Sequence, residues 1–64
     1  MSVKDRIQIE GAREKLTVAR VEIDDFRGFI IGIDDKELNV GLHFMVDEEN
    51  AEKVARWMLS RVRG

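Results

Sequence analysis

The chain has 64 residues, 38% of them charged, and a net charge of −2 at pH 7. It has no cysteine and only one histidine, which excludes a disulfide framework, thiolate metal centres and histidine-rich metal sites. A domain this short buries only about 60% of its unfolded surface and commonly depends on a partner chain. We therefore expect a single domain over residues 1–64 that forms a homodimer or higher oligomer, without a metal or cofactor.

The apolar segments of the chain are short. The first residues carry no apolar signal segment, and the longest apolar run is FIIGI at residues 29–33. A membrane-spanning helix needs about 20 predominantly apolar residues. We expect a soluble, cytoplasmic protein that does not use a membrane.

Alternation of apolar and polar residues predicts four strands, at residues 3–10, 16–23, 28–34 and 38–46. In the first strand Asp5 interrupts the apolar side, which is typical of an edge strand. Gly11 opens the connection to the second strand. Asp25 and Gly28 occupy the first and fourth positions that a type I turn favours, so a hairpin is expected there. The pattern predicts an antiparallel meander.

The hydrophobic period changes to 3.6 after Asp47, which predicts a helix over residues 48–62. Asp47 is a favourable N-cap, and Arg61 and Arg63 place positive charge in the last turn, where it complements the helix dipole. We expect this helix to pack on one face of the sheet, giving an α+β fold of order ββββα. The predicted core consists of Ile31, Leu42, Phe44, Val54 and Met58.

Two Asp-Asp pairs, Asp24-Asp25 and Asp34-Asp35, are the first candidates for a catalytic or metal site. They bracket one predicted strand, and ten extended residues span about 30 Å. Two pairs that far apart cannot share a substrate or a metal ion, so we interpret both as turn formers. No serine or threonine has a candidate base near it in the sequence. We expect no enzymatic activity.

The sheet face turned away from the predicted helix is the more informative surface, because it combines an apolar centre with basic and amide groups. In one interpretation a second subunit buries this face or the helix border, and the candidate interface residues are Trp57, Val18, Ile30, Met45 and His43. In the other, the face binds an extended single-stranded nucleic acid. The candidate phosphate contacts are then Lys4, Arg6, Arg13, Lys15, Arg20 and Arg27.

The segments VEIDDFRGFIIGI and GLHFMVDEENAEKVARWML contain a strand, an Asp-Phe-basic-Gly turn, further strands and the helix. In this order of elements the chain resembles the positive cofactor four family of single-stranded-DNA-binding transcriptional coactivators. The resemblance implies that the helices contribute to a dimer and that the sheets present grooves to single strands. The chain departs from this pattern in its acidic balance and in the lack of an aromatic residue on the presumed binding face.

The sequence therefore predicts a small non-enzymatic homodimeric module with a binding or regulatory role, acting through contacts with a protein partner that the residues do not identify. The alternative is a transcription-associated protein that binds single-stranded nucleic acid on the outer face of its sheet. The two hypotheses differ in the surface used and in the expected dependence of binding on salt.

Overall fold

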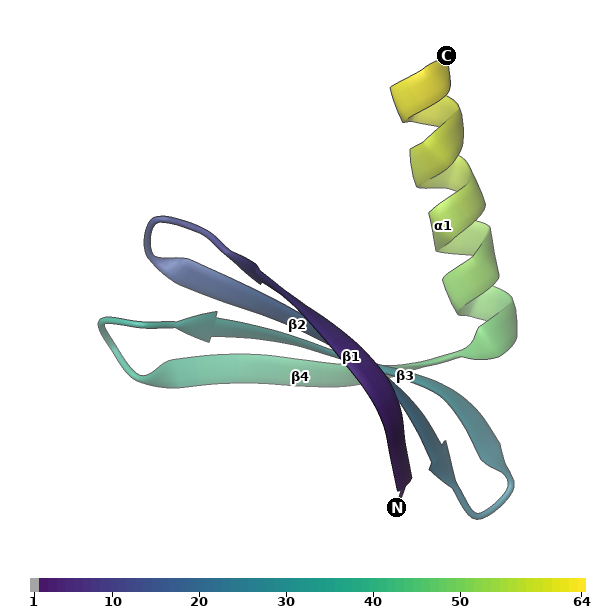
Figure 1. Cartoon of the computed structure of the whole chain (residues 1–64), viewed down its shortest axis with the longest axis horizontal. Helices are drawn as coiled ribbons and strands as arrows, with labels where there is room; N and C mark the ends of the chain where they lie inside the picture. Colours follow the sequence, from purple (N-terminus) through teal and green to yellow (C-terminus); the bar gives the residue numbers. More distant parts are fainter. Residues whose placement is uncertain (1) are drawn as a thin grey trace.

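The computed structural model describes residues 2–64 as one antiparallel sheet followed by one helix (Figure 1). Its elements are β1 (Ser2–Glu10), β2 (Glu14–Ile23), β3 (Phe26–Asp35), β4 (Val40–Asp47) and α1 (Glu48–Arg63). The strands lie in the order β1-β2-β3-β4, so each strand pairs with its neighbour in sequence. The predicted four-stranded meander with a C-terminal helix is confirmed, and the helix contacts β3 and β4.

The β2–β3 hairpin has a tighter turn than the sequence predicted. Ile23 pairs with Phe26, so Asp24 and Asp25 alone form the turn. Asp24 has a φ of 51°, a left-handed conformation that aspartate tolerates better than most residues. The predicted turn from Asp25 to Gly28 is wrong. Gly28 is buried inside β3, where a Cβ would lie 2.7 Å from the Phe26 ring.

Strand β1 lies at an edge of the sheet, as expected from the charge of Asp5 on its apolar side. Its pairing with β2 is irregular. Val3 pairs with Val21 and Asp5 pairs with Arg20, so Lys4 forms a bulge between them. Bulges and charged side chains on an edge strand discourage pairing with other chains. The β1 edge is therefore poorly suited to receive a further strand.

Cross-strand pairing determines which side chains share each face of the sheet, because directly opposed residues point to the same side. Leu16 pairs with Ile9 and Ile33, and Ile33 pairs in turn with Leu42. We call this side the apolar face after its apolar members: Ile7, Ile9, Leu16, Val18, Phe29, Ile31, Ile33, Val40, Leu42, Phe44 and Val46. Charged residues share this side at its two ends, with Asp5, Arg20, Glu22 and Arg27 at one end and Glu14 and Asp35 at the other. The opposite side is the mixed face: Arg6, Gln8, Lys15, Thr17, Ala19, Val21, Ile30, Gly32, His43 and Met45.

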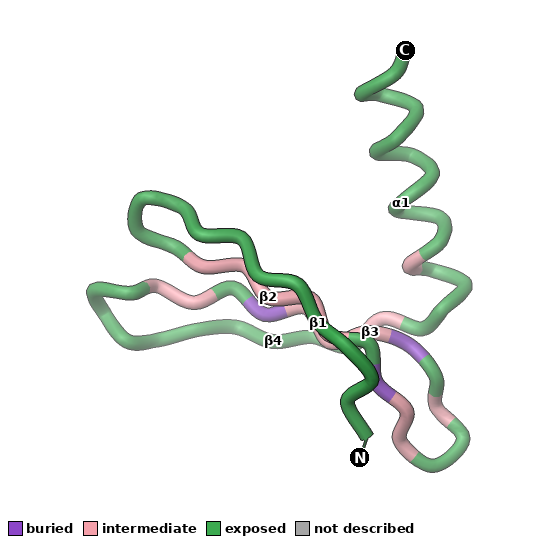
Figure 2. The backbone as a smooth tube through the Cα atoms, viewed as in Figure 1, coloured by how far each residue is buried: buried purple, intermediate pink, exposed green. Residues whose placement is uncertain are grey.

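Helix α1 rises away from the sheet and does not lie across it (Figure 1). None of its residues is buried, and only Ala51 is half-buried (Figure 2). The predicted core is consequently not formed within one chain: Leu42 is 75% exposed, and Phe44, Val54 and Met58 are about half exposed. The physical reason is that β4 ends at Asp47 and α1 begins at the next residue, which leaves no connection in which the chain could turn back.

The resulting molecule is extended for its size. Its radius of gyration is 13.2 Å, whereas a compact domain of this length has about 10.7 Å. It exposes 5404 Å² for a mass of 7.4 kDa, whereas a compact monomer of that mass exposes about 4200 Å². Among residues 2–64, Val21 is the one large side chain that is fully buried. A single copy therefore leaves most of its apolar residues in contact with water.

Candidate interaction surface

The apolar face presents two complete rows of aliphatic and aromatic side chains across the four strands. One row runs from Ile9 through Leu16 and Ile33 to Leu42, and the next runs from Ile7 through Val18 and Ile31 to Phe44. Most of these side chains are exposed or half-buried. Monomeric soluble proteins rarely expose a contiguous apolar patch larger than about 300–600 Å², and larger patches mark interaction surfaces.

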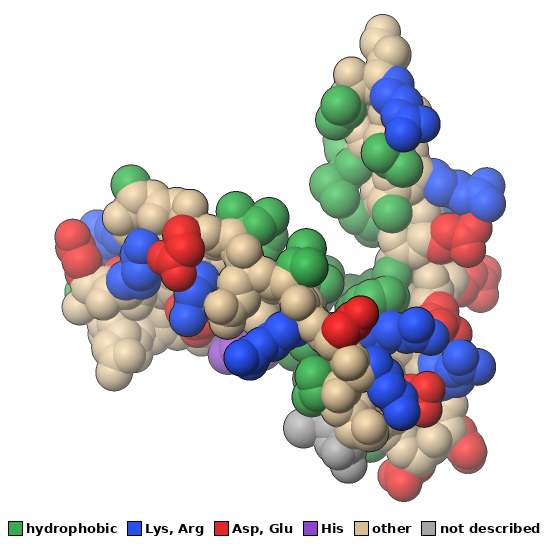
Figure 3. Space-filling model, viewed as in Figure 1, with side chains coloured by type: hydrophobic (Ala, Val, Ile, Leu, Met, Phe, Trp, Pro, Cys, Tyr) green, Lys and Arg blue, Asp and Glu red, His purple; other side chains and the backbone are tan. Residues whose placement is uncertain are grey.

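The helix carries a second apolar surface. Ala51, Val54, Ala55, Met58 and Val62 recur at helical spacing on one side, and Val62 is 83% exposed. Figure 3 shows hydrophobic side chains both on α1 and along the sheet next to the opening between them. Two unpartnered apolar surfaces therefore border the same opening.

A hollow marks the position where α1 leaves the sheet. It is lined by Arg20 and Phe29 from the sheet and by Glu48, Ala51 and Ala55 from the helix, together with Glu52. Since Ala51 and Ala55 belong to the apolar side of α1, this side is turned toward the apolar face. The two apolar surfaces converge at this hollow and diverge along the length of the helix (Figure 1).

The start of α1 is held by a cap and by two ion pairs. The Asp47 side chain accepts a hydrogen bond from the Asn50 backbone N–H at 3.0 Å, as an N-cap does. The Glu48 carboxylate lies 3.7 Å from the Arg20 guanidinium and 3.9 Å from that of Arg27. These contacts tie the first turn of the helix to β2 and β3, and so set the direction in which α1 leaves the sheet.

Trp57 lies on the border of the apolar side of α1 and is 59% exposed. The Arg61 guanidinium lies 5.4 Å from the centroid of its ring, within the range of a cation–π contact. The Ser60 hydroxyl donates a hydrogen bond to the Trp57 carbonyl oxygen at 2.7 Å. The indole keeps a free apolar surface that a second chain could cover.

The residues predicted to form an interface do not all lie on one surface. Val18 is on the apolar face, whereas Ile30, His43 and Met45 are on the mixed face and Trp57 is on α1. The hydrophobic pattern assigned Val18 to the mixed face because β2 is apolar on both sides, so alternation alone does not identify which side faces the same way as Leu42 and Phe44. The pairing of Leu16 with Ile33 shows that Leu16 and Val18 are on the side of Leu42 and Phe44.

His43 lies directly opposite Gly32 in the β3–β4 ladder. Its ring covers that glycine so closely that a Cβ there would be 2.6 Å from the imidazole Cδ2. Gly32 is buried under this ring. The side chain therefore covers a small residue of the mixed face, which is a packing role.

The predicted nucleic-acid contacts are divided between the two faces and are largely ion-paired. Four of the six lie within 4.0 Å of carboxylates of the same chain: Lys4, Arg13, Arg20 and Arg27. The other two, Arg6 and Lys15, are on the mixed face, where they pair opposite Ala19 and Asp34. These six side chains do not line one continuous basic groove.

The two Asp-Asp pairs lie at opposite ends of β3, as predicted. Asp35 stabilises the turn before β4: its Oδ1 accepts hydrogen bonds from the backbone N–H groups of Glu37 (2.9 Å) and Leu38 (3.0 Å), and its Oδ2 accepts one from Arg13 Nε (2.8 Å). These bonds, led by that from Leu38, hold the pKa of the Asp35 carboxyl below its usual range. Its role is to stabilise the turn.

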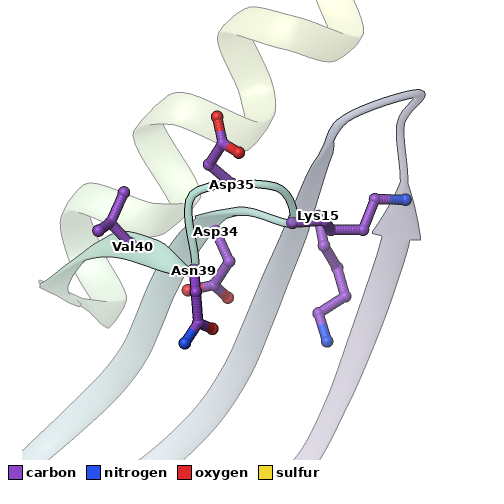
Figure 4. Close-up of a pocket in the computed structure, with 7 residues that line it drawn as sticks. Lys15, Asp34, Asp35, Asn39 and Val40 are labelled. Carbon is purple, nitrogen blue, oxygen red and sulfur yellow. The ribbon is translucent and has the colours of Figure 1, made fainter.

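A hollow beside this turn is lined by both Asp34 and Asp35 (Figure 4). Lys15, Asn39 and Val40 also line it, and Asn39 has a left-handed φ of 56°. Within residues 2–64, no three His, Asp or Glu side chains are close enough to one another to hold a metal ion.

Helix α1, the helix that the structure describes in residues 2–64, is too short and too polar to cross a membrane.

Comparison of the chain with protein-family models, with curated proteins and with solved structures finds no match. The function is therefore argued from the geometry described above. The most prominent feature of this geometry is the opening between the apolar face and α1, which the hydrophobic pattern did not predict. One sequence signal could have indicated it: the N-cap Asp47 directly follows the last apolar strand residue, Val46.

Proposed function

We propose that this chain is a non-enzymatic interaction module that becomes complete only as a homodimer. The second copy covers the apolar face and the apolar side of α1. The mixed face stays outside and offers its polar groups to a protein partner in a regulatory contact. This proposal keeps the homodimer expected from the sequence and moves its interface to the apolar face.

One observation supports the proposal above all others, the excess of exposed surface. The chain exposes 5404 Å², about 1200 Å² more than a compact monomer of this mass. In a standard protein–protein interface each partner buries about 800 Å². The excess is thus sufficient for a stable dimer, and the residues that produce it are the apolar ones expected in the centre of an interface.

The mixed face is the surface that such a dimer leaves accessible. It carries Arg6, Gln8, Lys15 and Thr17 beside a small apolar centre of Ile30 and Met45. Polar groups around a modest apolar centre are the usual composition of a non-obligate interface. This composition supports a role in recognising another protein and gives no support to catalysis.

Phe44 and Met45 provide a matched test, because they are neighbours on β4, are each 51% exposed and point to opposite faces. We expect the unmodified chain to have the mass of a dimer in light scattering after size exclusion. The substitution Phe44→Asp should convert it to a monomer or unfold it, because it places a charge in the apolar interface. The substitution Met45→Asp should leave the dimer intact.

The proposal fails if the unmodified chain is a folded monomer at every concentration examined. It also fails if the mass of a dimer survives Phe44→Asp. Circular dichroism of each variant shows whether the sheet is retained. A second variant, Leu42→Lys, tests the same face and should behave as Phe44→Asp does.

A further inference from the structure

The connection between β4 and α1 prevents the helix from covering its own sheet. Strand β4 ends at Asp47 and the helix begins at Glu48, with no residue between them. Strand–helix connections that return a helix onto a sheet usually have about 2–6 residues. The Asp47 cap and the ion pairs of Glu48 with Arg20 and Arg27 further fix the first turn. The apolar side of α1 must therefore find its partner on another molecule.

From this geometry we infer that two copies exchange their helices, so that α1 of each copy packs lengthways on the apolar face of the other. This inference rests on the proposed homodimer and specifies how it is built. Each chain carries one uncovered apolar sheet face and one uncovered apolar helix. A two-fold arrangement covers all four surfaces at once, because each contact is made twice.

The dimensions of the two surfaces agree. The apolar residues of α1 extend from Ala51 to Val62, about 17 Å along the helix axis at 1.5 Å per residue. Residues on one face of a strand are two apart, so successive rows are about 6.6–6.8 Å apart. The apolar face extends from the row of Phe29 to the row of Val40, three rows away, which is about 20 Å. Four strands spaced by about 4.8 Å provide enough width for a helix about 10 Å in diameter.

The charges at the ends of the two surfaces are compatible with this arrangement. The last turn of α1 carries the basic residues Arg61 and Arg63, and Arg61 lies beside the apolar side. The end of the apolar face farthest from the start of α1 is bordered by Glu14 and Asp35, which line a hollow with Ile33, Val40 and Leu42. Arg20 and Arg27 lie beside Phe29 on the same side of the sheet, and both guanidinium groups are paired with the Glu48 carboxylate, so the exchange places no unpaired cation against the apolar helix.

The absence of cysteine makes the exchange directly testable by cross-linking, because an engineered cysteine is then the only thiol in its chain. Two populations are mixed, unfolded and refolded together: one carries Met58→Cys on the apolar side of α1, the other carries Ile31→Cys on the apolar face. A short bifunctional maleimide is then added. We expect a covalent heterodimer, identified by mass spectrometry of the joined peptides.

Two matched controls use the same chemistry. Arg56→Cys places the thiol on the polar side of α1, and Met45→Cys places it on the mixed face. Mixing Arg56→Cys with Ile31→Cys, or Met58→Cys with Met45→Cys, should abolish the covalent product. Val18→Cys is an alternative to Ile31→Cys on the same face, in case the latter chain does not fold.

A measurement on the unmodified sequence complements the cross-links. In a mixture of isotope-labelled and unlabelled copies, isotope-filtered nuclear Overhauser effects report contacts between different chains only. We expect such contacts between the Met58 methyl group and the side chains of Ile31 or Phe44. Their presence supports the exchange without any substitution.

The outcomes separate this inference from the proposed function. A dimer by light scattering that gives only Met58-to-Met58 cross-links, or equal products with the mixed-face control, overturns helix exchange and leaves the homodimer standing. A chain that is monomeric throughout overturns both. A dimer with the helix-to-apolar-face product, lost in both controls, supports both.

Discussion

The Arg20 guanidinium lies 3.7 Å from the Glu48 carboxylate, and this ion pair joins the centre of β2 to the first residue of α1. Both side chains are nearly half exposed, so solvent screens their attraction. In a double-mutant cycle of Arg20→Ala and Glu48→Ala, we expect a coupling energy of about 0.2–1 kcal/mol. Urea unfolding of the four proteins measures it. A coupling several times larger would show that the pair is more shielded than the structure indicates.

Trp57 supplies an intrinsic probe of association, because it is the single tryptophan and is 59% exposed in one copy. On dimerisation part of the indole leaves water, which shifts its fluorescence emission to shorter wavelength. We expect the emission of the unmodified chain to shift to longer wavelength as the protein is diluted. In Phe44→Asp the emission should be independent of dilution, since that variant has no dimer to dissociate.

Gly28 and Gly32 form a matched pair of buried glycines on β3 that should differ in their tolerance of alanine. A Cβ at Gly28 would collide with the backbone oxygen of Val46, which cannot move without breaking the β3–β4 ladder. A Cβ at Gly32 would meet only the His43 ring, which can rotate away. We expect Gly28→Ala to cost about 1–3 kcal/mol in the free energy of unfolding, as overpacking does. Thermal unfolding should show a clearly smaller loss for Gly32→Ala.

Asp35 should contribute to the acid sensitivity of the fold. The hydrogen bonds from Leu38, Glu37 and Arg13 lower its pKa in the folded chain. A carboxyl with a lowered folded pKa stabilises the fold above its unfolded pKa, and this stabilisation is lost as pH falls through the folded pKa. Thermal unfolding as a function of pH should therefore decline less steeply in acid for Asp35→Asn than for the unmodified chain. Asp25→Asn, which removes one negative charge from the turn at the other end of β3, is the matched control for the loss of a carboxylate.

Single-stranded nucleic acid should bind weakly, because four of the six candidate basic side chains are ion-paired within the chain. We expect little change in the fluorescence anisotropy of short DNA and RNA oligomers at about 50 mM salt, where electrostatic affinity is high. The same measurement at higher salt should show no further loss. Tight binding that falls steeply with salt and is removed by Arg6→Glu would instead favour the nucleic-acid alternative.

The sequence predicted the elements of the fold well because each has a local signal. The alternation of Leu38, Val40, Leu42 and Phe44 indicated the last strand, and Asp47 indicated the start of the helix. Strand β4 begins at Val40, two residues later than predicted, because the turn stabilised by Asp35 extends to Asn39. Such boundaries depend on side-chain hydrogen bonds that alternation does not reveal.

The faces of the sheet and the position of the helix could not be predicted in the same way. Strand β2 has apolar residues on both sides, so the choice between Val18 and Ala19 for the apolar face depends on pairing with Ile31 and Ile30 in β3. The periodicity of α1 shows that one of its sides is apolar, but not which sheet covers it. That information comes from the direct step from strand to helix, because no loop residue separates Asp47 from Glu48.

The bulge at Lys4 makes the two edges of the sheet unequal. The outer edge of β4 runs regularly from Val40 to Asp47 with few charges, whereas β1 is kinked and bears Lys4, Asp5 and Arg6. Any strand added to this sheet would consequently join β4. Two copies meeting there would both turn their irregular strands outward, so growth would stop at a closed pair and would not proceed to a fibre.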